Sequence, residues 1–430
     1  MSLPRNPVRI IVTLILLSLC VYVIRLTGRA GLSRLYSTAA IKGSMMPGAN
    51  ADGLVAAAED SLRLAPLDPE ARRARGIAKL SQGKPAEAAD EFAHAASLRP
   101  RHYLLWMDVG RARDQTDDVT GAIQAFREAV RLAPYFAQPR WQLANVLFRA
   151  EKYDEAFPEL RRAIAGDPSL LPLSMELAWA GSRGDARTFM QMIEPQSASQ
   201  RLIVGRFLAK HGKAREAVEL FHNAGGIAEA DQRALVGELI NARQFPEAYE
   251  VWVSGREGVD STNRGIAAIT DGGFENRIVR DDPGFGWRVN TEVATFRVTL
   301  DADAKNEGAR SLRMEWNGES NPTSQLVTQI VMVEPKSSYR LTFRAHARGL
   351  VTGGLPVVVL SDASSEKYSV LGESEMISEG EQDWSEYKVD FKTGEKSNAV
   401  LISLQRRPCA TAQCPIFGRV WLDGFVMAKG

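Results

Sequence analysis

The chain has 430 residues, 45% of them hydrophobic, with 53 basic residues against 52 acidic ones. This length exceeds one ordinary domain and predicts two or three globular units with packed cores. The formal charge of +1 excludes a general electrostatic attraction to nucleic acid, so no nucleic acid is expected as a partner. Three cysteines are too few for a disulfide-dense scaffold or a zinc protein.

An apolar run of fifteen residues occupies positions 10–24. As a helix it would span roughly 22 Å, less than the ~30 Å hydrocarbon core of a bilayer, so the flanking arginines would have to snorkel. Two interpretations remain open. A cleaved signal peptide would use Gly28 and Ala30 as its small residues. A retained signal anchor is favoured, because Arg25 and Arg29 are charged where a cleavage region is usually neutral.

A period of 34 residues dominates the middle of the chain. The prolines that keep this period are Pro66, Pro100, Pro134 and Pro168. In the copy that ends at Pro100, Gly76 is followed twelve residues later by Ala88 and then by Phe92. Small residues let two helices approach closely, the aromatic ring fills the remaining space, and proline ends the second helix.

This pattern resembles the tetratricopeptide repeat, a 34-residue unit of two antiparallel helices. Looser copies continue to Trp252, so six to seven helix pairs are expected over residues 51–255. One pair cannot bury its apolar face alone, and the copies must therefore stack into an α-solenoid. The resemblance implies a groove that holds a protein partner.

After Thr270 apolar and polar residues alternate between turn residues, which predicts an antiparallel β-sandwich. In the strand at residues 339–347, alternation places Tyr339 and Phe343 on one face and Arg344 on the other. Eight strands are expected, starting at Thr295, Ser311, Leu326, Tyr339, Leu355, Trp384, Ala399 and Arg419.

Segments of this region resemble, in order, bacterial carbohydrate-binding modules of the galactose-binding-like jelly-roll type. They are DGGFEN from Asp271, GFGW from Gly284, ARSLRMEW from Ala309, VEPKSSYRLTFRAHARG from Val333, WSEYKVDF from Trp384 and GRVWLDGF from Gly418. Many proteins of this architecture bind glycans, while others bind proteins or cap an assembly.

The same resemblance implies a structural calcium ion held by Glu275 and Asp423. Oxygen ligands suit calcium, and backbone carbonyls would have to complete the shell of six to eight ligands. The alternative is that both side chains are solvated carboxylates at turns or strand ends.

Sugar binding needs aromatic faces and planar polar side chains. For each candidate the alternative is a core tryptophan or a solvated surface residue. The candidates are Trp287, Trp316, Tyr368 and Trp384 for stacking, and Arg344, Arg348, Gln405 and Arg406 for an acidic or hydroxyl-rich glycan.

Cys409 and Cys414 have four residues between them, close enough for a disulfide across a turn. A disulfide is favoured over two free thiols. It would form in an oxidising compartment, which agrees with export behind an N-terminal membrane segment.

No phosphate-binding glycine loop, GxSxG elbow or HExxH helix occurs in the sequence. Carboxylates cluster from Glu373 to Asp383, and a polar loop explains them better than a glycosidase pair. No catalytic residue and no required cofactor are therefore expected.

The predicted fold class is multidomain α + β, with a membrane helix, an α-solenoid and a jelly-roll sandwich. The expected segments are a signal anchor or signal peptide at 1–30, a spacer at 31–50, the solenoid at 51–255, a linker at 256–270 and the jelly roll at 271–430.

The expected function is a non-enzymatic, single-pass adaptor of the bacterial inner membrane. Its repeats would bind a protein and its jelly roll a polysaccharide, in the periplasm or outside the cell, during exopolysaccharide biosynthesis or secretion. Three alternatives stay open: secretion after signal cleavage, an envelope assembly scaffold whose jelly roll binds no sugar, and a polysaccharide-acting enzyme with an unrecognised site.

Overall fold

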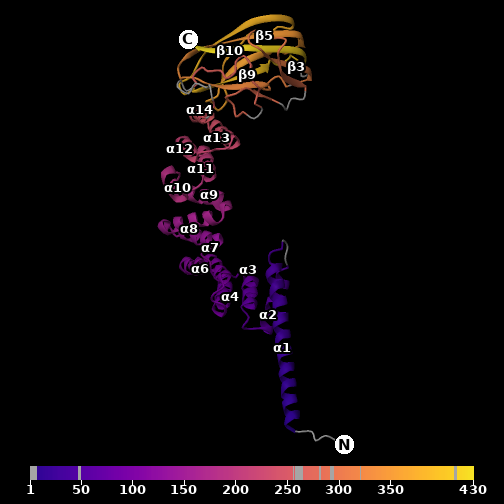
Figure 1. The fold of residues 1–430 in the computed structure, drawn as a ribbon, viewed down its shortest axis with the longest axis vertical. Coiled ribbons are helices and arrows are strands. Elements are labelled where there is room, and N and C mark those ends of the chain that lie inside the picture. Colours follow the sequence, from indigo (N-terminus) through magenta and orange to yellow (C-terminus); the bar gives the residue numbers. More distant parts are fainter. Residues whose placement is uncertain are drawn as a thin grey trace. The chain divides into compact units, whose positions relative to one another are not determined.

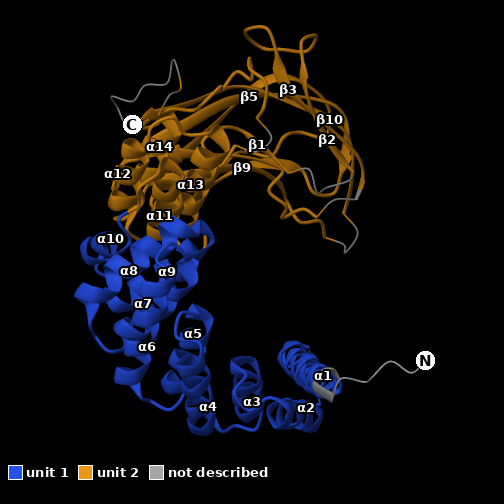
Figure 2. Cartoon of the chain, turned by 60° about the horizontal axis from the view of Figure 1, so that its bottom comes forward, with its two compact units in different colours: residues 1–194 blue, residues 195–430 orange. Residues whose placement is uncertain are grey.

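The computed structural model describes residues 7–46, 50–254, 256, 265–279, 282–290, 295–319, 321–410 and 414–430. Within these ranges the chain forms α-helices α1 to α14, followed by β-strands β1 to β10 (Figure 1). The chain divides into two compact units, residues 1–194 (unit 1) and residues 195–430 (unit 2) (Figure 2). This arrangement confirms the predicted solenoid followed by a sandwich.

Unit 1 is built from consecutive helices that pack as neighbours. In Figure 2, α5 and α9 lie on the inner side of the curve of unit 1, and α6, α8 and α10 lie on its outer side. The helices are α1 (Pro7–Gly43), α2 (Ala51–Leu64), α3 (Pro69–Ser81), α4 (Pro85–Leu98), α5 (Tyr103–Asp114), α6 (Val119–Leu132), α7 (Ala137–Arg149), α8 (Tyr153–Gly166), α9 (Leu171–Gly181) and α10 (Ala186–Ile193).

Two of the helix pairs close around a glycine. A Cβ atom on Gly76 of α3 would lie 2.4 Å from the ring of Phe92 in α4. Gly110 of α5 faces Phe126 of α6 in the same way, at 2.6 Å. Both rings are 1% exposed. The register of 34 residues therefore brings the glycine and the phenylalanine of one pair into contact, and glycine leaves the room that the ring needs.

Helix α1 is much longer than the apolar run at residues 10–24. It continues without a break to Gly43. By length and composition alone, the part from Ile10 to Gly43 could cross a membrane, and a signal sequence would meet the same criterion.

The predicted spacer at residues 31–50 is helical as far as Gly43. Ser33 is fully buried, and its Oγ donates to the Ser61 carbonyl of α2 at 2.9 Å. Ser61 Oγ donates back to the Ser33 carbonyl at 2.9 Å. Ala40 is 1% exposed on the same side of α1. Ser33 and Ala40 therefore lie at close-packing positions between α1 and α2, and this part of the predicted spacer is helical.

Unit 2 contains the last two helix pairs and all the strands. The helices are α11 (Ala198–Lys210), α12 (Ala214–Ala224), α13 (Glu229–Asn241) and α14 (Phe245–Val253). The strands are β1 (Arg288–Val289), β2 (Phe296–Asp301), β3 (Ser311–Glu319), β4 (Val327–Met332), β5 (Ser338–Thr352), β6 (Pro356–Asp362), β7 (Val370–Glu373), β8 (Gly380–Lys392), β9 (Ala399–Arg406) and β10 (Pro415–Lys429).

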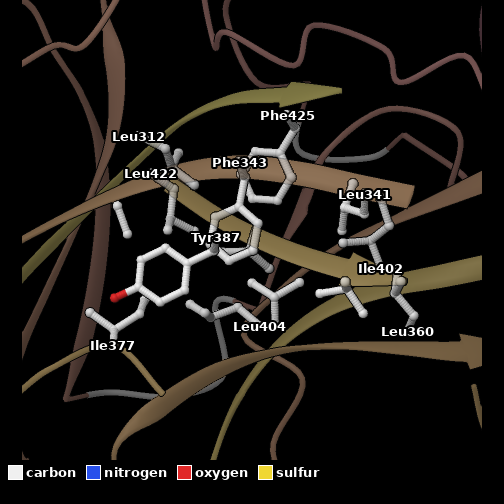
Figure 3. Packing of buried hydrophobic residues seen from close by; sticks show 14 of the residues in the cluster. Leu312, Leu341, Phe343, Leu360, Ile377, Tyr387, Ile402, Leu404, Leu422 and Phe425 are labelled. Atoms are coloured by element: carbon white, nitrogen blue, oxygen red, sulfur yellow. The ribbon is translucent and has the colours of Figure 1, made fainter. Parts of the chain in front are cut away.

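The strands form two five-stranded antiparallel sheets. Sheet A has the order β1-β4-β9-β6-β7, and sheet B has the order β2-β3-β10-β5-β8. Their inner faces share one apolar core. In it Phe343 stacks on Tyr387 and Phe425, with centroids 5.2 and 4.9 Å apart, and Ile402 and Leu404 come from sheet A (Figure 3). Burial of these rings and aliphatic side chains provides the main stabilisation of the sandwich.

All eight predicted strands are present. The structure adds β1 and β7, two short strands at the edges of sheet A. Most of the predicted linker at residues 256–270 lies outside the described residues. Its last part follows sheet A, because Ala267 N donates to the Met332 carbonyl at 2.8 Å.

Candidate functional site

Two of the tryptophans predicted to contact a ligand lie in the core. Trp287 is 5% exposed, and its Nε1 donates to the Asp271 carbonyl at 3.0 Å. Trp316 is 2% exposed and packs against Phe296, with ring centroids 5.2 Å apart. Neither ring offers a face to a ligand, because neighbouring side chains already cover both.

Arg406 is also interior, at 2% exposure, and burial lowers the pKa of its guanidinium. Its Nη2 donates to the Cys414 carbonyl at 2.9 Å and to Thr352 Oγ1 at 2.8 Å. Its Nε donates to the Gly354 carbonyl at 3.2 Å. Cys414 forms a disulfide with Cys409. Arg406 therefore ties β9 to the disulfide loop and does not face a ligand.

Gln405 lies in β9 of sheet A, and Tyr368 lies in the connection between two strands of that sheet. Both are therefore separate from the two candidate arginines of β5, which is in sheet B. Gln405 Nε2 donates to Ser403 Oγ at 2.8 Å. Tyr368 is 44% exposed in the connection between β6 and β7. The predicted site residues are therefore divided between two sheets and the core.

The outer face of sheet A is closed over much of its area. Val359 and Ser403, paired across β6 and β9, are 5% and 0% exposed. A Cβ atom on Gly284 would lie 2.7 Å from Ile330 of β4 and 3.4 Å from Ile240 of α13. The end of α13 thus lies against this face.

A second contact joins the end of α13 to sheet A. Arg243, in the turn between α13 and α14, donates from Nη2 to the Glu366 carbonyl at 3.4 Å. Glu366 lies in the connection between β6 and β7, near Tyr368. The α13–α14 turn is therefore in direct contact with the β6–β7 connection of sheet A.

On the outer face of sheet B, arginines of β5 form cross-strand ion pairs with carboxylates of β8, and Arg344 and Arg348 are the predicted site residues among them. Arg340 Nε lies 2.7 Å from Asp390 Oδ1, and the hydrogen bond lowers the pKa of Asp390. Arg344 Nη2 lies 3.4 Å from Glu386 Oε2. Directly opposed charges of this kind support strand pairing, with modest energy because they are exposed.

An aromatic row crosses the same face of sheet B. His346 of β5 lies between Trp384 of β8, at 5.6 Å, and Trp421 of β10, at 4.9 Å. The guanidinium of Arg348 lies 5.9 Å from the Trp421 ring, and Trp421 Nε1 donates to Asp301 at 2.9 Å. Trp421 is 3% exposed and Trp384 is partly exposed.

Sequence reasoning named Arg348 and Trp384 without placing them together. It missed Trp421 and His346 as members of one row. Alternation was the available signal, because Trp421 lies between the core residues Val420 and Leu422 and must face outward.

The two predicted calcium ligands converge on one loop. Asp423 Oδ2 accepts from Asn306 N at 2.9 Å and from Glu307 N at 3.1 Å. Glu275 Oε1 accepts from Ala309 N at 2.9 Å. These bonds hold the β2–β3 connection against the sheet.

The two carboxylates at this loop have the charge that a cation needs, but two side chains are few ligands for calcium. A Cβ atom on Gly273 would lie 3.8 Å from an oxygen of each carboxylate. Burial raises the pKa of Asp423, and the charge of Glu275 raises it further, although backbone N–H groups oppose both effects. Among the described residues no third acidic, histidine or cysteine side chain joins the pair.

In unit 1 ion pairs link the first helices of successive repeats, α3, α5 and α7. Asp108 of α5 is 7% exposed and lies 2.6 Å from both Arg73 of α3 and Arg111 of α5. Asp114 of α5 pairs with Arg149 of α7. Arg73 also lies 4.0 Å from Glu70 of α3, so each guanidinium group of this network has a carboxylate partner.

Comparisons with known proteins match two separate parts of the chain. Residues 73–135 match the tetratricopeptide repeat family, and residues 267–411 match the carbohydrate binding domain family. No curated protein matches the sequence. The chain thus contains a tetratricopeptide-repeat region followed by a C-terminal domain that matches the carbohydrate binding domain family.

Solved structures show distant similarity. MamA from Desulfovibrio magneticus RS-1 is 22% identical, with 39% of this chain and 94% of that chain covered and a TM-score of 0.33. The CBM22-1 xylan-binding domain of Paenibacillus barcinonensis Xyn10C is 13% identical, with 36% and 90% covered and a TM-score of 0.27. Scores this low carry no information on ligand or partner.

Proposed function

We propose that this chain is a non-enzymatic, membrane-tethered adaptor whose repeats bind a protein and whose jelly roll binds a glycan. The observation that carries the proposal is the presence, in one chain, of a tetratricopeptide-repeat match and a carbohydrate-binding-domain match. An apolar helix, α1, precedes both. Helical repeats offer extended surfaces for peptides, and a jelly roll offers an open sheet face for a sugar chain.

Helices α3, α5 and α7, the first helices of successive repeats, are the proposed protein-binding surface. The side chains of Arg111 and Arg149 are 47% and 54% exposed, whereas their partners Asp108 and Asp114 are 9% and 31% exposed. The guanidinium groups therefore lie closer to solvent than the carboxylates. Such a surface favours an acidic segment of a partner protein.

The glycan-binding surface is assigned to the outer face of sheet B. That face carries the partly exposed Trp384, whose ring packs on the buried His346 and, through it, Trp421. The outer face of sheet A is instead buried at Val359 and Ser403, and the end of α13 approaches it at Gly284. The arginines Arg340, Arg344 and Arg348 of this face are each near a carboxylate. Charge is therefore nearly balanced, and a neutral, hydroxyl-rich glycan fits better than a strongly acidic one.

The proposed location is the bacterial inner membrane, with both units in the periplasm or outside the cell. Two features support it: the long apolar helix α1 and the disulfide between Cys409 and Cys414, which persists in oxidising compartments. Exopolysaccharide biosynthesis or secretion is the proposed setting. A calcium ion at Glu275 and Asp423, completed by backbone carbonyls and water, is part of the proposal.

The second candidate is an assembly scaffold whose jelly roll is structural. It is favoured by the contact between α13 and sheet A, because a domain that closes the end of a solenoid has a role without any ligand.

Binding of the full-length chain to a glycan array, in lipid nanodiscs and with or without calcium, separates the two candidates. The adaptor proposal expects retention on at least one neutral polysaccharide. Absence of binding to every neutral and acidic glycan would contradict the adaptor proposal and support the assembly scaffold. Release of shortened products would indicate an enzyme.

A further inference from the structure

The connections α2–α3, α4–α5, α6–α7 and α8–α9 of unit 1 share one exposed surface. We call this surface the apolar edge; it comprises the connections before α3, α5, α7 and α9 and the first turn of α9. Among the described residues from 50 to 194, the exposed large apolar side chains all lie on it. They are Leu67 (76% exposed), Tyr135 (93%), Phe136 (57%) and Leu173 (59%).

The opposite edge is polar. Its turns, at residues 82–84, 115–118, 150–152 and 182–185, carry no exposed large apolar side chain. The connections of the apolar edge carry Arg99 and Arg101 against Asp68 and Asp167, whereas the opposite turns carry Lys84, Lys152 and Arg183 against Asp117, Asp118, Glu151 and Asp185. The last turns of α2 and α6 add Arg63 and Arg131, each paired with a carboxylate of its own helix.

The first part of the apolar edge is continuous in space. Arg99, before α5, lies 3.0 Å from Glu70 in the first turn of α3. Tyr103, at the start of α5, contacts Phe136, before α7, with ring centroids 5.3 Å apart. Basic and apolar side chains thus form one surface that spans three successive connections.

Helix α1 fixes where this surface lies along the membrane helix. Arg29 Nη2 lies 3.5 Å from the Arg63 carbonyl at the end of α2, so the α2–α3 connection is beside residue 29. A hydrocarbon core of ~30 Å takes about twenty helical residues. Counted from Ile10, that length ends near residue 29, at the level of the α2–α3 connection.

We infer that the apolar edge of unit 1 rests on the lipid headgroup region around α1, with Leu67, Tyr135 and Phe136 in contact with lipid. Apolar and tyrosine side chains are favoured at this depth, and arginines beside them pair with lipid phosphates. Continuity with the membrane helix identifies the partner as the surface of a lipid bilayer. The inference rests on the tethering part of the proposed function.

Fluorescent labelling tests this in liposomes of phosphatidylcholine and phosphatidylglycerol. The full-length chain with Cys20→Ser, and with the Cys409–Cys414 disulfide intact, carries one new cysteine labelled with the NBD fluorophore. Leu67→Cys and Tyr135→Cys probe the apolar edge. Gln82→Cys and Gln115→Cys are the matched controls on exposed positions of the opposite edge.

The inference expects a blue-shifted emission and loss of most intensity to lipid-borne doxyl quenchers at positions 67 and 135, with no such change at 82 and 115. Equal quenching at positions 67 and 82, or at positions 135 and 115, overturns the inference. Labelling native Cys20 in the unsubstituted chain tests the tether separately, because that residue lies within the apolar run. If the label at Cys20 is not quenched, both the membrane tether and the lipid contact of the apolar edge are contradicted. If it is quenched, a negative result at positions 67 and 135 contradicts only the lipid contact of the apolar edge.

Discussion

Trp252, in the last helix of the repeats, donates its indole N–H to a carboxylate oxygen of Asp282 at 3.0 Å. Asp282 is 3% exposed, and its other oxygen accepts from Gly284 N and Gly286 N at 2.9 and 2.8 Å. Phe285 contacts the Trp252 ring at 5.7 Å. One buried carboxylate therefore connects α14 to the segment that leads into β1, and the last helix pair is coupled to the sandwich.

Replacing Asp282 by asparagine should destabilise this junction. An amide N–H₂ would face the indole N–H, leaving a buried donor without an acceptor, at an expected cost of about 2–3 kcal/mol. Trp252→Phe keeps the ring and removes the N–H, so we expect about 1 kcal/mol. Hydrogen exchange of the amides in α14 and β4 measures both effects. Unchanged exchange in both variants would show that the bond does not hold the junction.

Gly76→Ala should destabilise the first repeat. The added methyl would approach the ring of Phe92, which is 1% exposed and has little room to move. We expect a loss of about 1–3 kcal/mol from overpacking, reduced by alanine's higher helix propensity. Hydrogen exchange of the α3 and α4 amides reports this local stability.

Gly237→Ala is the matched control for that substitution. Gly237 lies in α13, and no atom comes within 4 Å of an added Cβ. Alanine there should stabilise the helix by up to about 1 kcal/mol. A stabilising Gly76→Ala would contradict the packing account of the repeat.

Calcium should raise the melting temperature of unit 2 if it binds at Glu275 and Asp423. Without a cation, the raised folded-state pKa of Asp423 means that the native state binds its proton more tightly than the unfolded chain does. This carboxyl therefore favours the fold below its unfolded pKa, and that contribution is lost as pH rises through the folded pKa. A cation would counter the loss above that pKa.

Thermal melts with calcium or with a chelator, at several pH values, measure this effect. The expected calcium-dependent rise should appear above the pKa of Asp423, fade on acidification, and be absent in Glu275→Gln. Equal melting temperatures in calcium and in chelator at neutral pH would contradict calcium binding at Glu275 and Asp423.

Much of the fold could be predicted because it depends on local periodicity. The 34-residue register predicted the helix pairs, and period-two alternation predicted the eight longer strands. Strands β1 and β7 were not predicted, because segments of two and four residues are too short to show period-two alternation. The helical continuation of α1 was not predicted, because the serine, glycine and alanine residues after Tyr36 suit a spacer and a tight helix contact equally well.

The candidate site was less predictable because it depends on contacts between distant parts of the chain. Ile240 and Ile330 approach the same point at Gly284 although 90 residues separate them, and no local pattern indicates that sheet A is closed there. Trp316 is different, because it shares a strand face with Leu312 and Met314, and that alternation already pointed to the core.

The most direct test of the adaptor account is affinity electrophoresis of the full-length chain in gels that contain the neutral polysaccharide it binds best. The account predicts that Trp384→Ala, on the open face of sheet B, abolishes most of the retardation. Tyr368→Ala, an exposed aromatic residue at sheet A, should leave it unchanged. Retardation that survives Trp384→Ala and disappears with Tyr368→Ala would contradict the assignment of the ligand to sheet B.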